Sequence, residues 1–225
     1  MIDNFFHSLD WSVLTDVLIS VIPALFCITI HELAHGLTAY RLGDGTAKEM
    51  GRLTLNPIRH IDIFGLIMLV IFKFGWAKPV PVNMRNFKKP RTGMALTAIA
   101  GPLSNILLAT VVLFIYGLVY TPLGGGKNRG EDGVILSIIQ RIALLSVTLA
   151  VFNLLPIPPL DGSKVAFSFL PDRIYWKLMR YERYGIIILI LILNTRFFNE
   201  TFGAVTMDLF DRFFSIAQFA HDLFR

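Results

Sequence analysis

The sequence predicts an all-α polytopic membrane protein with about four to six membrane segments and a short membrane-embedded strand or re-entrant region after the first helix. Of the 225 residues, 54% are hydrophobic and only 16% are charged, whereas about 25% are charged in a typical soluble domain. The mean hydropathy of +0.61 and the 19 phenylalanines indicate a lipid-facing surface as well as a core. We expect one integral membrane domain over residues 1–225, with a core over 11–162 and membrane or amphipathic helices over 184–225.

Long apolar stretches place the first expected membrane segments. A spanning helix needs about 20 apolar residues, because each residue adds about 1.5 Å across a hydrocarbon core of about 30 Å. Residues 11–40, 93–120 and 134–155 meet this length. Residues 63–76 are shorter and contain Lys73, so we expect this segment to enter the membrane incompletely.

The C-terminal stretches are less clearly membrane-spanning. Residues 184–198 are apolar over too short a range to predict a full span. Residues 202–224 carry polar side chains every three or four positions. This spacing predicts an amphipathic helix that lies in the interface or docks on the protein.

Lysines and arginines in the loops predict the orientation. They are concentrated in residues 41–61, 73–91 and 163–183 and are sparse in 121–133. The positive-inside rule then places the basic loops in the cytoplasm and the N-terminus outside. Since residues 11–40 end inside and the next long span must begin inside, the segment 63–76 cannot cross the membrane once.

The first long helix contains the pattern His31-Glu32-Leu33-Ala34-His35 near its end. Histidines at i and i+4 share one helical face and can bind one metal ion, and Glu32 can act as the base for a bound water. The alternative is a helix end whose histidines meet lipid headgroups. Ionisable residues within a membrane segment are costly, however, and indicate function. The pattern therefore predicts a zinc site with His31 and His35 as ligands and Glu32 as the catalytic residue.

A catalytic zinc site normally has a third protein ligand. The carboxylates in or beside apolar segments are Asp16, Asp62 and Asp161. Asp16 lies at the opposite membrane face from His31, whereas Asp62 follows the first helix. Asp161 follows a proline-rich break after the span 134–155, which runs in the same direction as the first helix. We therefore expect Asp161 to be the third ligand, with Asp62 as the alternative and a simple turn role as the other interpretation.

The two motifs together resemble the site-2 protease family of intramembrane zinc metalloproteases, in a compact form without a PDZ domain. The similarity rests on HELAH and NLLPIPPLDG, supported by GRLTLNPIRHID, FGWAKPVPVN and AGPLSN. It implies one Zn²⁺ per chain, held by His31, His35 and Asp161, with Glu32 as the acid and base. It also implies that Asn153 contacts substrate or an oxyanion, and that residues 51–61 form a membrane-embedded strand.

Two further side chains have competing interpretations. Cys27 lies on the same helical stripe as His31 and His35, so it could be a fourth ligand or an oxidisable thiol, but a buried core residue is the favoured interpretation. Asn105 lies four residues after Gly101, a spacing that favours close helix packing. Contact of Asn105 with substrate is the second interpretation.

The function expected from these residues is hydrolysis of peptide bonds within or near transmembrane segments of membrane proteins. The expected partners are such a substrate and the lipid bilayer, with a homo-oligomer or a separate gating partner left open. A net charge of +5 is too small to indicate nucleic acid. The expected location is a prokaryotic cytoplasmic membrane, with the active site toward the cytoplasm. The alternatives are a metal or proton transporter and a catalytically silent membrane scaffold.

Overall fold

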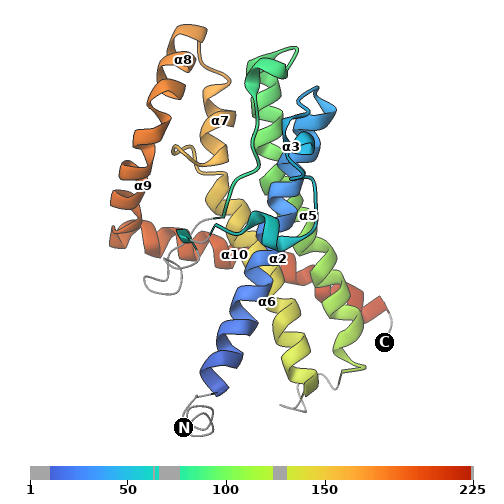
Figure 1. Ribbon diagram of the computed structural model, residues 1–225. Helices are drawn as coiled ribbons and strands as arrows, with labels where there is room; N and C mark the ends of the chain where they lie inside the picture. Colours follow the sequence, from blue (N-terminus) through green and yellow to red (C-terminus); the bar gives the residue numbers. More distant parts are fainter. Residues whose placement is uncertain (1–10, 63, 66–76, 124–130, 224–225) are drawn as a thin grey trace, which may run out of the picture.

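The computed structural model describes residues 11–62, 64–65, 77–123 and 131–223 (Figure 1). In this part of the chain the regular structure is helical, which confirms the all-α expectation. Its elements are α2 (Trp11–Arg41), α3 (Thr46–Glu49), η1 (Pro57–His60), η2 (Met84–Asn86), α5 (Pro90–Tyr120), α6 (Glu131–Asn153), α7 (Asp161–Phe167), α8 (Asp172–Tyr181), η3 (Glu182–Tyr184), α9 (Gly185–Leu193) and α10 (Arg196–Leu223).

Three long helices form the centre of the molecule. Helix α5 runs antiparallel to α2 and α6, so the end of α2 and the start of α5 lie at the same end of the bundle (Figure 1). Within the described residues, three helical stretches are long and apolar enough to cross a membrane: Val21–Arg41, Pro90–Tyr120 and Gly133–Asn153. This antiparallel arrangement agrees with the predicted parity, whereas the expected segment 63–76 lies almost wholly outside the described residues.

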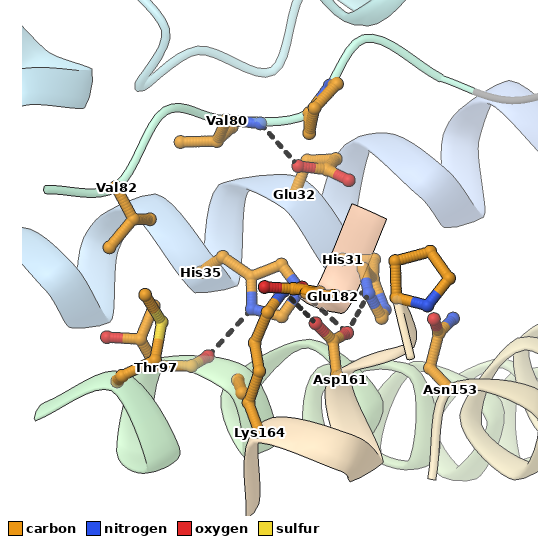
Figure 2. Close-up of a pocket in the computed structure, with 14 residues that line it drawn as sticks. His31, Glu32, His35, Val80, Val82, Thr97, Asn153, Asp161, Lys164 and Glu182 are labelled. Carbon is orange, nitrogen blue, oxygen red and sulfur yellow. Dashed lines mark hydrogen bonds and ion pairs between the residues drawn. The ribbon is translucent and has the colours of Figure 1, made fainter. Parts of the chain in front are cut away.

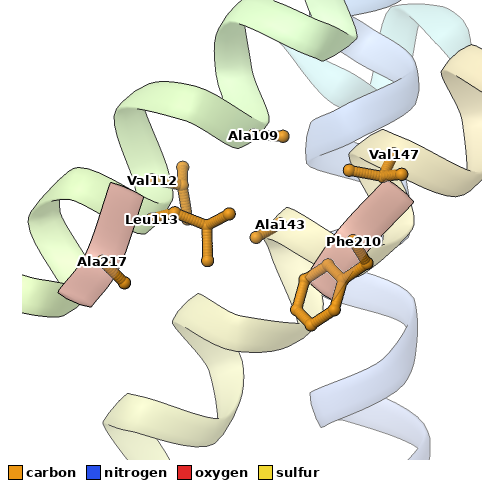
Figure 3. Packing of buried hydrophobic residues seen from close by; sticks show 7 residues of the cluster. All are labelled: Ala109, Val112, Leu113, Ala143, Val147, Phe210 and Ala217. Atoms are coloured by element: carbon orange, nitrogen blue, oxygen red, sulfur yellow. The ribbon is translucent and has the colours of Figure 1, made fainter. Parts of the chain in front are cut away.

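Helix α10 packs across α5 and α6. The shared core consists of Ala109, Val112 and Leu113 from α5, Ala143 and Val147 from α6, and Phe210 and Ala217 from α10 (Figure 3). Small side chains permit the close approach. A Cβ atom added to Gly117 would lie 2.1 Å from the carbonyl oxygen of Ala217. The amphipathic helix expected over 202–224 is therefore a docked helix, which extends N-terminally to Arg196.

The described loop after α2 is irregular. The expected strand over 51–61 is not seen there: this loop contains the 3₁₀ helix η1 and only an isolated bridge between Ile61 and Ala77. The reason is local. Asn56 accepts a hydrogen bond from the Ile58 amide, and Pro57 has no N–H to donate to a strand partner. The expectation of a strand within 51–61 is therefore corrected to a capped turn.

The polypeptide after α6 folds back beside the bundle. Helix α6 ends at Asn153, where the proline-rich segment begins, and α7 starts at Asp161. Helix α9 spans only Gly185–Leu193, too short to cross alone. The stretch Asp172–Leu193 meets α10 at an angle of 88°, so the pair counts as at most one bent span, for a total of up to four candidate spans.

Candidate metal centre

Three predicted ligands converge in one place. His31 and His35 come from consecutive turns of α2, and Asp161 is the first residue of α7. The Nε2 atoms of His31 and His35 lie 3.0 Å apart, and Oδ2 of Asp161 lies 3.1 Å from each of these nitrogens (Figure 2). We call His31, His35 and Asp161 the ligand cluster. All three side chains are largely buried, with residue exposures of 6%, 8% and 9%.

The non-helical segment 154–160, which follows α6, brings Asp161 to the two histidines. Helices α2 and α6 run in the same direction (Figure 1), and the chain leaving α6 leads to α7, whose first residue places Oδ2 3.1 Å from Nε2 of His31. The segment 154–160 then turns back, and α7 packs directly on it. Gly162 makes this packing possible, because an added Cβ would lie 2.2 Å from the carbonyl oxygen of Leu154.

Contacts behind the imidazole rings orient them. Nδ1 of His35 donates a hydrogen bond to the carbonyl oxygen of Thr97 at 2.7 Å, which leaves the Nε2 lone pair facing the ligand cluster. On His31, the Asn105 amide nitrogen lies 3.1 Å from Nδ1, while the buried Asn105 oxygen has no partner. Rotating the amide by half a turn pairs that oxygen with an Nδ1–H group and likewise frees Nε2 of His31.

The histidine rings occupy space that Gly101 of α5 leaves open. A Cβ atom added to Gly101 would lie 2.5 Å from Nε2 of His35 and 2.6 Å from Cε1 of His31. Any larger side chain would therefore push both rings. The sequence indicated helix packing for Gly101, and the structure shows that the packed groups are the imidazoles of the ligand cluster.

The ligand cluster suits a zinc ion. Two imidazole nitrogens and one carboxylate oxygen are a normal donor set for catalytic zinc, and donors around tetrahedral zinc lie about 3.3 Å apart. The three atoms here lie within 4.8 Å of one another. Burial alone would raise the pKa of the Asp161 carboxyl, but when the His31 and His35 rings carry protons on Nε2, their hydrogen bonds and charge lower that pKa below its usual range. A carboxylate that stays ionised is the form that binds a cation.

Glu32 lies beside the ligand cluster without joining it. Its side chain projects toward the other side of α2 and accepts a hydrogen bond from the Val80 amide at 2.7 Å (Figure 2). One oxygen, Oε2, is engaged there. Glu32 is half-buried and lines the same cavity as the ligand cluster.

A half-open cavity of about 390 Å³ joins these groups. Its walls include Val82, Met94, Asn153, Lys164 and Glu182 (Figure 2). The Lys164 ammonium lies 3.9 Å from Oδ1 of Asp161 and 3.6 Å from Glu182. Sequence reasoning missed Lys164 and Glu182. The i+3 spacing of Lys164 from Asp161 was a usable signal, whereas the approach of Glu182 required the fold.

The asparagines occupy two different places. Asn153 lines the cavity and donates one amide hydrogen to the carbonyl oxygen of Leu149 at 3.0 Å. Asn105 is fully buried behind the ring of His31 and is absent from the cavity lining. Its position fits an orienting contact with His31 better than contact with a substrate.

The alternative ligands lie elsewhere. Asp62 accepts a hydrogen bond from the Gly65 amide, and Asp16 lies at the far end of α2. Cys27 is fully buried, with Sγ 3.3 Å from the hydroxyl of Ser146, which agrees with the core interpretation. Among the described residues, the group that could hold a metal ion consists of the ligand cluster alone.

A histidine pair and an aspartate beside a glutamate-lined cavity, on helices long enough to cross a membrane, are features of a membrane-embedded metallohydrolase. The sequence profile of Peptidase family M50 matches residues 127–193, which include Asp161. No solved structure shows a significant match to the chain.

Three relatives extend the similarity over most of the chain. "Putative zinc metalloprotease YwhC" of Bacillus subtilis is 43% identical over 178 residues, covering 78% of this chain and 80% of that protein. "Putative zinc metalloprotease Rip2" of Mycolicibacterium smegmatis is 30% identical, covering 83% and 71%. "Putative zinc metalloprotease MJ0611" of Methanocaldococcus jannaschii is 31% identical, covering 66% and 69%. The chain belongs to Peptidase family M50, the site-2 protease family of zinc metalloproteases, and is therefore a hydrolase.

Proposed function

We propose that this protein is an intramembrane zinc endopeptidase, which hydrolyses peptide bonds within or near transmembrane segments of other membrane proteins. The observation that carries the proposal is the position of the ligand cluster. It lies between α2, α5 and α7, beside a half-open cavity, where two of the three helices are candidate membrane spans. This position supports a substrate that reaches the cavity from within or near the membrane.

The ligand cluster holds the metal in this proposal, with one Zn²⁺ per chain. Bound zinc supplies Lewis acidity, which activates water at neutral pH and polarises the scissile carbonyl. Thr97 and Asn105 keep the two Nε2 lone pairs aimed at one point. Lys164 contacts the second oxygen of Asp161 and so favours the orientation in which Oδ2 faces the histidines.

Glu32 moves the proton. Since Oε2 is bound by the Val80 amide, Oε1 is the atom that takes a proton from the attacking water and returns it to the leaving amine. Asn153 retains an amide hydrogen not used in its bond to Leu149. From the cavity wall, that hydrogen can stabilise the oxyanion that forms on the peptide carbonyl.

The proposed setting is the cytoplasmic membrane of a prokaryotic cell, with the active site toward the cytoplasm. The relatives in Bacillus and Mycolicibacterium are bacterial, and several helices can span a membrane. The loops rich in Lys and Arg follow α2, precede α5 and follow α7 in the sequence, and the positive-inside rule places such loops in the cytoplasm. The proposed partners are a transmembrane substrate, lipid, and either a second copy or a gating protein.

The experiment is cleavage-site mapping in proteoliposomes. Purified protein is mixed with single-span membrane proteins, and mass spectrometry locates the new termini. The proposal predicts cuts within or close to the apolar segment, and cleavage reduced by about 100-fold or more with Glu32→Gln. Cuts confined to water-exposed loops would contradict the intramembrane assignment. Zinc flux across the same vesicles without cleavage would favour the transporter alternative.

A further inference from the structure

We infer that Val80 is a positioning residue for Glu32, and that the buried side chains of Arg52 and Asp44 hold the peptide segment that presents it. This inference rests on the proposed function, since it gives Glu32 the proton-transfer role. It concerns a contact between a backbone amide and a carboxylate, with no part in metal binding.

The segment 78–83 passes over the cavity and offers Glu32 one donor. The amide nitrogen of Val80 lies 2.7 Å from Oε2 of Glu32 (Figure 2). Residues 79 and 81 are prolines, which have no N–H group and fix their own backbone φ angle. Val80 itself is 7% exposed. Val80 is therefore flanked on both sides by prolines, and its N–H is the donor that the segment offers to Glu32.

Arg52 binds the carbonyl end of the peptide group that joins Pro79 and Val80. Its Nη2 atom donates to the carbonyl oxygens of Lys78, at 2.6 Å, and Pro79, at 3.2 Å. The Pro79 carbonyl and the Val80 N–H belong to one planar peptide unit and point in opposite directions in the trans form. Arg52 and Glu32 thus hold opposite ends of that unit. Because Arg52 is only 6% exposed, water competes weakly for these bonds.

Asp44 fixes the far end of the segment. Its Oδ2 atom accepts a hydrogen bond from the Asn83 amide at 2.7 Å, and Oδ1 accepts one from the Asn86 side chain at 2.8 Å. Asp44 is fully buried. At the near end, the Lys78 amide donates to the carbonyl oxygen of His60 at 2.9 Å. The segment is therefore tied down on both sides of Val80.

This arrangement gives two buried charges a role that the metal site does not explain. A glutamate side chain has several accessible rotamers, and proton transfer needs the carboxylate within hydrogen-bond reach of the reacting water. A backbone donor cannot rotate away, so it holds Oε2 and leaves Oε1 free. Losing the donor should lower kcat rather than raise KM, because preorganisation is lost and substrate contacts are kept.

The test compares Val80→Pro, which deletes the N–H, with Val80→Ala, which keeps the N–H and trims the side chain. It is paired with Arg52→Met and Arg52→Lys. For each purified full-length variant, kcat, KM, zinc per chain and melting temperature in detergent are measured. We expect kcat of Val80→Pro to fall by about 10- to 100-fold, the range for a hydrogen bond to a charged group. Its KM and zinc content should stay within about twofold, which is below the change expected on loss of one hydrogen bond.

The matched variants separate positioning from packing. Val80→Ala should retain at least about tenfold more kcat than Val80→Pro. Arg52→Lys keeps the charge but not the planar fork, so its kcat should lie between those of wild type and Arg52→Met. If Val80→Pro does not fold, the Arg52 pair decides the question.

The inference is overturned if Val80→Ala and Val80→Pro lose kcat equally, if Arg52→Met keeps the wild-type kcat, or if lost activity follows lost zinc. A wild-type protein that binds zinc but cleaves no membrane substrate would instead overturn the proposed function. The two failures are therefore distinguishable.

Discussion

Oδ2 of Asp161 lies 3.1 Å from Nε2 of His31, although the two residues are 130 positions apart in the sequence. Helix α6 ends at Asn153, and the segment between α6 and α7 brings Asp161 to the two histidines of α2. A metal site assembled from such distant segments depends on the packing of the helices, so metal content reports on the fold as well as on the ligands.

Replacement of the aspartate should release zinc. Asp161→Ala removes one of three donors and leaves two imidazoles, so zinc affinity should fall by about 100-fold or more, beyond the loss seen for outer-shell partners. Asp62→Ala should retain zinc, because Asp62 instead contacts the Gly65 amide. Metal analysis of both purified variants after dialysis checks this. Zinc loss in Asp62→Ala alone would show that the wrong carboxylate was assigned.

A methyl group at Gly101 should disturb the metal site from behind. Its Cβ would lie 2.5 Å from Nε2 of His35, so the rings must shift, at a cost of about 1–3 kcal/mol. Gly101→Ala should lower both thermal stability and zinc retention. Gly203→Ala is the control, because its added Cβ meets nothing within 4 Å. Equal melting temperatures and zinc contents in the two variants would contradict the packing seen here.

Asp44 should give the protein an acid-sensitive contribution to stability. Burial alone would raise the pKa of Asp44, but hydrogen bonds from Thr46, Asn83 and Asn86 outweigh it and lower the pKa below its usual value. A lowered folded-state pKa stabilises the fold above the unfolded value of about 3.9, and this contribution is lost as pH falls through the folded pKa.

At pH 7, Asp44→Asn should therefore have a free energy of unfolding about 1–3 kcal/mol below that of wild type, and should melt at a lower temperature. The difference should shrink below pH of about 4. Thermal melts in detergent across this range measure it. A stability difference between wild type and Asp44→Asn that grows as the pH falls would contradict a lowered pKa of Asp44.

The topology follows from the loop charges. Single cysteines at Lys88 and Asn128, in a Cys27→Ala background, should react with a membrane-impermeant reagent from opposite sides of the membrane. The background substitution is needed because Cys27 is the native thiol. Labelling of both positions from one side would refute the orientation and the parity argument built on it.

The sequence predicted the parts of this site that depend on periodicity. The i, i+4 histidines must share a helical face, and the proline-rich break after Asn153 must end a helix, so α2, α6 and the three converging residues could be predicted. Contacts made through backbone atoms could not be predicted from the sequence. The Thr97 carbonyl that orients His35 and the Val80 amide that holds Glu32 leave no side-chain signal.

The loop after α2 was harder to predict for a different reason. The resemblance to the site-2 protease family implied a strand over 51–61, but Asn56 and Pro57 form a capped 3₁₀ turn. In that loop the local hydrogen bond from the Ile58 amide to the Asn56 side chain competes with β-sheet hydrogen bonds, which need a partner strand from elsewhere in the chain. Arg52 likewise looks like a surface charge in the sequence, and only the fold shows that it is buried against the carbonyl oxygens of 78 and 79.

In the proposed mechanism the ligand cluster binds zinc while Glu32 performs the proton transfer. The most direct measurement is zinc per chain together with turnover of a transmembrane substrate, in the same preparations of wild type, Glu32→Gln and His31→Ala. Glu32→Gln keeps the shape of the side chain and should retain near-normal zinc, but turnover should fall by about 100-fold or more. His31→Ala should lose both zinc and turnover. Substantial turnover by Glu32→Gln would contradict the proposed role of Glu32 in proton transfer.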